Sequence, residues 1–142
     1  YWRSAVRSSG VRRFGTRLGT TRQEIGSIDL VATGAVAVGP AGERIGKGSG
    51  YFDLEYVILR EIGSVHEATP LCALVDDCQV REEVPMEGQD VAVDFIVTPT
   101  RIITVERPLP RPAKIPWGLL DERRIKGMRP LRELKEEYER KG

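Results

Sequence analysis

Residues 28–38 read IDLVATGAVAV, and this stretch decides the fold. Its apolar run is nearly continuous and shows no regular alternation with polar side chains. Such runs are typical of a strand that is buried on both faces, as in a parallel sheet. The segment VGPAG (38–42) then favours a turn, so AVAV (35–38) and ERIG (43–46) are predicted to pair as a hairpin.

A helix and more strands follow this hairpin. Residues 51–62 predict an amphipathic helix because their apolar side chains fall on one face. Continuous apolar runs predict core strands at LCALV (71–75) and VAVDFIV (91–97), and RIITVE (101–106) is a third short strand. With a strand near 28–33, this order predicts an α/β layered domain.

The two ends of the chain have a different character. The arm 1–19 is basic, with helix expected in part of it, and a capping pattern at Thr21 predicts a single helical turn. Prolines exclude regular hydrogen bonding in 107–117, which is predicted to be an extended strap with Trp117 as its anchor. The charged segment 129–141 is predicted to be the C-terminal helix.

Composition narrows the class of protein. The chain has 142 residues, of which 40% are hydrophobic and 30% charged, and its formal net charge is +1. These values fit one globular domain, and no apolar run reaches the roughly 18 residues of a membrane span. Cys72 and Cys78 form neither a disulfide framework nor a metal knuckle, which indicates reduced thiols in a cytoplasmic protein. Because the chain starts at Tyr1, we expect it to be an N-terminally truncated part of a domain.

The segment RIGKGSGYFD (44–53) carries the functional signal. Glycines allow a ligand to approach the backbone closely, and the start of a helix offers unpaired amides and a partial positive charge. Arg44 and Lys47 add cations, so the segment favours a polyphosphate, and Asp53 can hold a metal. The spacing matches neither a Walker loop nor a dinucleotide fingerprint. A glycine turn without a ligand is the alternative.

The segments IDLVATGAVAV, GPAGE, RIGKGSGYFD, DDCQV and DVAVDFIVTPTR, in this order, resemble 5-formyltetrahydrofolate cyclo-ligase, also called methenyltetrahydrofolate synthetase. The family run R-[LI]-G-x-G-x-G-Y-[YF]-D is present from Arg44 to Asp53, and the family V-D pair at Val93–Asp94. The resemblance covers about residues 28–105. The arm and the strap are more similar to the branch called cyclo-ligase-related, or synthetase domain-containing, proteins.

The resemblance implies a three-layer α/β sandwich with a mostly parallel central sheet, similar to the ribose-5-phosphate isomerase and glucosamine-6-phosphate deaminase type of fold. It also implies an enzyme that uses ATP and Mg²⁺ to close 5-formyltetrahydrofolate to 5,10-methenyltetrahydrofolate. In that reaction the formyl oxygen attacks the γ-phosphate, and the neighbouring folate nitrogen closes the ring and expels phosphate.

The site residues follow from the same resemblance. The ATP loop would be Arg44, Ile45, Gly46, Lys47, Gly48, Ser49, Gly50, Tyr51 and Phe52. Arg44 and Lys47 would be catalytic, and Asp53 and Asp94 would hold Mg²⁺. Asp94 also attracts attention without the family, because a carboxylate inside an apolar strand is costly unless it is paired or metal-bound. A salt bridge to Arg101 or Lys47 is its structural alternative.

Two departures of this sequence from the family pattern leave other functions open. Phe52 replaces the second family tyrosine, and the sequence from Tyr1 onward does not include the basic K-x-x-[LM]-R helix that the resemblance implies at the start of the domain. A non-catalytic nucleotide- or folate-binding module is therefore an alternative to the enzyme, and RNA binding through the arginine-rich arm is another. Asp76 and Asp77 follow a predicted strand, where they can face a ligand crevice or form a turn.

Overall fold

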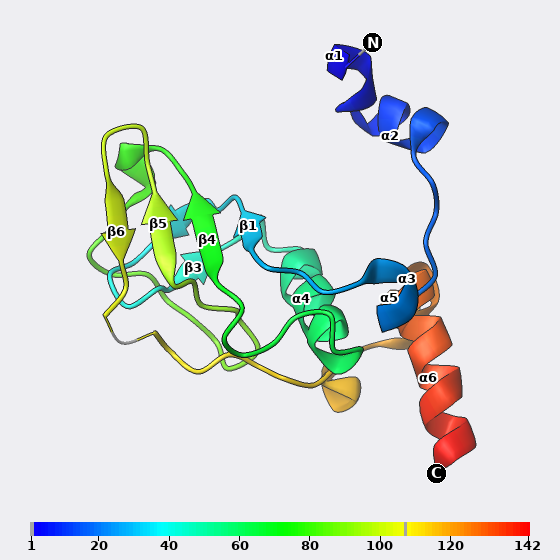
Figure 1. Cartoon of the computed structure of the whole chain (residues 1–142). Coiled ribbons are helices and arrows are strands. Elements are labelled where there is room, and N and C mark those ends of the chain that lie inside the picture. Colours follow the sequence, from blue (N-terminus) through cyan, green and yellow to red (C-terminus); the bar gives the residue numbers. More distant parts are fainter. Residues whose placement is uncertain (1, 107) are drawn as a thin grey trace.

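The computed structural model describes residues 2–106 and 108–142 and centres on a four-stranded sheet (Figure 1). The strands are β1 (Val31–Thr33), β4 (Leu71–Leu74), β5 (Phe95–Val97) and β6 (Ile102–Thr104), in the order β1-β4-β5-β6. The β1–β4 and β4–β5 pairs are parallel, and β5–β6 is antiparallel. The α/β class with a mostly parallel central sheet is therefore confirmed.

The predicted hairpin forms a separate two-stranded sheet. Its strands β2 (Ala37–Val38) and β3 (Arg44–Ile45) pair antiparallel. The predicted strand 91–97 is shorter in the structure and begins at Phe95. The backbone at Val93 bonds outside the four-stranded sheet, because the amide of Val93 donates to the carbonyl of Gly42 in the hairpin turn at 2.9 Å.

Helix α4 (Tyr51–Glu61) lies between the hairpin and β4 in the chain and supplies much of the core. Its buried side chains include Leu54, Val57 and Ile58. They belong to one cluster with the sheet residues Leu71 and Ile96, which are both fully buried. The predicted helix and its apolar face are thus confirmed.

The N-terminal arm lies away from the sheet (Figure 1). It contains α1 (Trp2–Ala5) and α2 (Ser8–Phe14), followed by α3 (Arg22–Ile25). The hydroxyl of Thr21 accepts from the amide of Glu24 at the start of α3, as the capping pattern predicts. No helix in the described part of the chain has both the length and the apolar character needed to cross a membrane.

The described part of the strap before η2, residues 108–116, has no regular structure and leads back to the core and into the C-terminal elements. These are the short 3-10 helix η2 (Trp117–Leu119), α5 (Glu122–Gly127) and α6 (Arg129–Lys141). Ile115, Ile125 and Leu131 bury their side chains in the same cluster as α4. The strap and the C-terminal helices are therefore packed parts of this structure. The side chain of Trp117 is partly buried and packs against the core cluster.

The turn after β4 is held by carboxylates. Asp76 caps the 3-10 helix η1 (Asp77–Gln79), and Asp77 accepts hydrogen bonds from the hydroxyls of Thr98 and Thr100 at 2.6 and 2.7 Å. Of the two roles that the sequence leaves open for these acids, the structure shows the turn role.

Asp77 gives a pH prediction. The Thr98 and Thr100 hydroxyls, and then the nearby Arg101, lower the pKa of Asp77 below its ordinary value. A carboxyl whose pKa is lower in the folded state adds stability above its unfolded pKa and loses it as the pH falls through the folded pKa. We expect Asp77→Asn to flatten the acid side of the stability profile, measured by urea unfolding between about pH 2 and 6. An unchanged pH slope would contradict this role.

Candidate functional site

The glycine-rich loop between β3 and α4 ends in left-handed backbone. Gly48 has φ 82° and Gly50 has φ 65°, and Gly50 caps α4 without any side chain. Within the described chain, no group accepts hydrogen bonds from the first-turn amides of α4, at Tyr51, Phe52 and Asp53. Such amides, at the positive end of the helix dipole, form a site for an anion.

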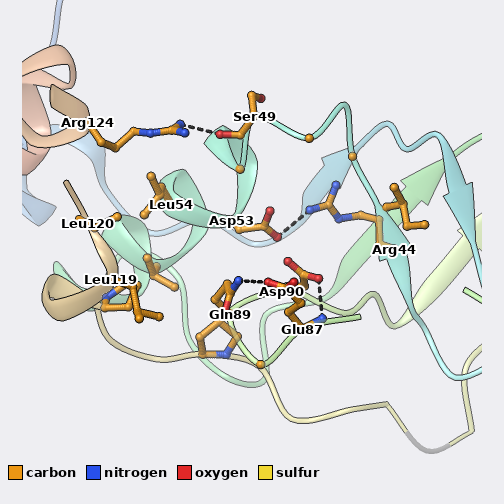
Figure 2. Close-up of a pocket in the computed structure, with 18 of the residues that line it drawn as sticks. Arg44, Ser49, Asp53, Leu54, Glu87, Gln89, Asp90, Leu119, Leu120 and Arg124 are labelled. Carbon is orange, nitrogen blue, oxygen red and sulfur yellow. Dashed lines mark hydrogen bonds and ion pairs between the residues drawn. The ribbon is translucent and has the colours of Figure 1, made fainter. Parts of the chain in front are cut away.

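A cavity of about 750 Å³ opens beside this loop (Figure 2). Its lining comes from three segments of the chain. The first runs from Arg44 through the loop into α4, the second is the turn 87–90, and the third is the stretch 112–124 that follows the strap. This volume lies in the range of small-molecule sites, which is about 300–1,000 Å³.

Arg44 is buried under the loop with an exposed fraction of 3%. Its Nη2 donates to Oδ1 of Asp53 at 2.7 Å, its Nε donates to the carbonyl of Val91 at 3.4 Å, and the guanidinium lies 4.5 Å from the ring centre of Phe52. Its Nη1 lies close to Gly46, where an added Cβ would come within 3.1 Å of it. Arg44 is thus fixed with one nitrogen near the glycine loop.

Asp53 is the acid of this arrangement. Its Oδ1 accepts from Arg44 and also from the amide of Val91 at 2.9 Å. Both bonds use the same oxygen, so Oδ2 is the atom that can ligate an ion brought into the cavity. One carboxylate oxygen together with phosphate oxygens and water is the donor set that Mg²⁺ prefers, so Asp53 fits that ion.

The structure places the other predicted ATP-site side chains unequally. Lys47 is exposed and does not line the cavity, whereas its neighbours Gly46 and Gly48 do. Tyr51 is half exposed, and its ring lies 4.7 Å below the guanidinium of Arg124. On the β3 side of the loop, the cation that lines the cavity is therefore Arg44 and not Lys47.

Asp94 lies apart from the cavity lining. Its Oδ2 accepts from the amide of Leu71 at 2.9 Å and from Nη1 of Arg111 at 2.7 Å. Arg111 also donates to the carbonyl of Glu67 at 2.8 Å. The partly buried carboxylate is paired, but its partner is an arginine of the strap and not Arg101 or Lys47. Joint Mg²⁺ binding by Asp53 and Asp94 stays a prediction.

Sequence reasoning missed several residues of the cavity. Glu87 and Asp90 bond to each other's backbone amides in the turn 87–90, and Gln89 donates to the carboxylate of Glu87. Asp121 caps α5, and Arg124 follows in its first turn. The capping pattern at Asp121 was the one local sequence signal for these residues, and it indicates only where α5 begins. The approach of residues 112–124 to the glycine loop depends on the path of the strap, which no local pattern predicts.

The fold and the site together define an α/β protein with a cavity at the mouth of a glycine-rich loop. The profile of the 5-formyltetrahydrofolate cyclo-ligase family matches residues 7–99. The chain therefore belongs to the 5-formyltetrahydrofolate cyclo-ligase family.

Individual relatives agree with this assignment. The chain is 41% identical over 142 residues to the methenyltetrahydrofolate synthase domain-containing protein of Bos taurus, covering 99% of the chain and 37% of that protein. It is 42% identical over 117 residues to the protein of the same name from Homo sapiens, covering 81% of the chain and 30% of that protein. The 5-formyltetrahydrofolate cyclo-ligase of Mycolicibacterium smegmatis is 32% identical over 85 residues, covering 60% of the chain and 41% of that protein. The chain thus spans only about a third of the length of the first two relatives.

Proposed function

We propose that the cavity binds the triphosphate of ATP together with Mg²⁺, and that the protein cyclises 5-formyltetrahydrofolate to 5,10-methenyltetrahydrofolate at the expense of ATP. The observation that carries the proposal is the glycine loop itself. Gly46, Gly48 and Gly50 line the cavity next to the free first-turn amides of α4. Backbone donors of this kind bind phosphate without side chains.

The charges of the lining support the need for a divalent cation. Four acids line the cavity, Asp53, Glu87, Asp90 and Asp121, against two bases, Arg44 and Arg124. A triphosphate alone would add more negative charge to a wall that already carries an excess of carboxylates. An accompanying Mg²⁺ near Asp53 would neutralise part of that charge, as phosphoryl transfer requires. The cytoplasmic setting of the reaction is part of the same proposal, and it is supported by the free thiols of Cys72 and Cys78.

Arg44 is the residue of this chain best placed to assist the transfer. Asp53, Val91 and Phe52 hold its guanidinium in one orientation. A cation that is oriented before the substrate arrives stabilises charge in the transition state without reorganisation. The formyl oxygen would attack the γ-phosphorus with release of ADP, and ring closure by the second folate nitrogen would then release phosphate.

A binding module without turnover is the second candidate. The outward position of Lys47 favours it, because the loop then presents one cation fewer to a phosphate. In this reading the same cavity binds ATP or a folate, but no reaction follows.

One assay separates the two candidates. The full chain is incubated with ATP, Mg²⁺ and 5-formyltetrahydrofolate, and ADP and the methenyl product are measured. The enzyme predicts equal amounts of both products, with ADP formation dependent on the folate. Saturable ATP binding without either product would contradict turnover and support the binding module.

A further inference from the structure

The cavity has a wall that the family profile does not include. The profile ends at residue 99, but the lining continues with Pro112, Pro116, Leu119, Leu120, Asp121 and Arg124. This second wall is anchored to the main core, because Ile115 within it and Ile125 directly after it are both buried there. The strap also bonds to α4, where the carboxylate of Glu61 accepts from the amide of Ile115 at 2.9 Å.

Arg124 is the cationic residue that this wall brings to the glycine loop (Figure 2). Its amide donates to Oδ1 of Asp121 at 2.7 Å, which fixes the start of α5. Its Nη1 then reaches the carbonyl of Ser49 at 2.5 Å, and the guanidinium covers the ring of Tyr51. One side chain from the C-terminal segment thus contacts both sides of the helix start.

The bonding of Arg124 differs from that of the other cations near the loop. Arg44 is ion-paired with Asp53, and Lys47 lies outside the cavity. Among the residues that the structure describes, no carboxylate forms an ion pair with the guanidinium of Arg124. A guanidinium has five N–H donors in a planar fork that suits phosphate oxygens. Its bond to one carbonyl leaves donor capacity that faces the cavity.

We propose that Arg124 is a polyphosphate-binding residue, which completes the nucleotide site from outside the glycine loop. The inference rests on the proposed function and assigns the ligand class as a nucleoside triphosphate whose phosphates lie between the α4 amides and Arg124. In the bound state the guanidinium keeps its place over Tyr51 and adds charge-assisted bonds to the phosphate oxygens. The strap then acts as the element that positions this cation.

The test uses Arg124→Met with Arg123→Met as its matched control. Arg123 is adjacent on the same helix, is exposed and does not line the cavity, so both variants lose one positive charge. Binding of ATP and of inorganic tripolyphosphate, each with Mg²⁺, is measured by calorimetry on the full chain. We expect Arg124→Met to weaken both ligands about ten- to hundredfold, and Arg123→Met to change them less than about threefold.

Further readouts separate binding from structure. Arg124→Lys is expected to recover part of the affinity for tripolyphosphate, and the melting temperature of Arg124→Met should stay close to that of the unaltered chain. Equal affinities in the two Met variants would overturn the inference, as would an affinity loss in Arg124→Met that its lowered melting temperature accounts for. Failure of the unaltered chain to bind either ligand would instead overturn the proposed function.

Discussion

Arg44→Met is expected to destabilise the protein by about 3–5 kcal/mol, the usual cost of removing one partner of a buried ion pair. Arg44 is 3% exposed, and its loss would leave the carboxylate of Asp53, which is 16% exposed, without its cation at 2.7 Å. The contact with the ring of Phe52 would also be lost. The free energy of unfolding from urea titration measures the effect.

Lys47→Met is the matched control for this prediction. It removes the same charge three residues further along the chain, but Lys47 is exposed. Exposed substitutions of this kind usually change stability by no more than about 0.5 kcal/mol. A loss below about 1 kcal/mol in Arg44→Met would mean that the Arg44–Asp53 pair does not hold the loop to α4.

Gly42→Ala is expected to cost about 2–5 kcal/mol. Gly42 has φ 85°, and left-handed backbone costs an alanine about 1–2 kcal/mol. An added Cβ would also come within 2.3 Å of the carbonyl oxygen of Val93, so the backbone must shift. Such overpacking costs about 1–3 kcal/mol more. The same shift would weaken the bond from the Val93 amide to Gly42, which links the hairpin to the segment before β5.

Two glycine controls separate these contributions. Gly48 has φ 82°, but no atom lies within 4 Å of an added Cβ, so Gly48→Ala measures only the cost of a left-handed backbone for alanine. Gly34→Ala has open space and no positive φ, and should be nearly neutral. If Gly42→Ala and Gly48→Ala lose equal stability, the close approach of Val93 does not constrain this turn.

The sequence predicted the elements whose causes are local. The period of apolar residues in 51–62 marks α4, the Gly-Pro turn marks the hairpin, and the hydroxyl of Thr21 caps α3 as its spacing indicates. The strand predicted at 91–97 begins only at Phe95, because the backbone of Val93 bonds to Gly42, a tertiary contact that the local sequence does not indicate.

The missed features of the site are long-range. The sequence predicts that Asp94 either holds a metal or forms a salt bridge with Arg101 or Lys47, and nothing in it selects Arg111 among the many arginines as the partner. The approach of Arg124 to Ser49 joins residues 75 positions apart. It depends on how the proline-rich strap runs past α4, and no periodicity or spacing encodes that path.

Calorimetric titration of ATP into the full chain, with Mg²⁺ and with a chelator, tests the central claim of a phosphate site at the glycine loop most directly. Gly48→Asp puts a carboxylate on the cavity wall, and Gly34→Asp adds the same charge at an exposed position outside the lining. We expect one saturable, Mg²⁺-dependent site in the unaltered chain and in Gly34→Asp, weakened at least about tenfold in Gly48→Asp. Equal affinities in all three proteins, or no saturable binding in the unaltered chain, would contradict the account.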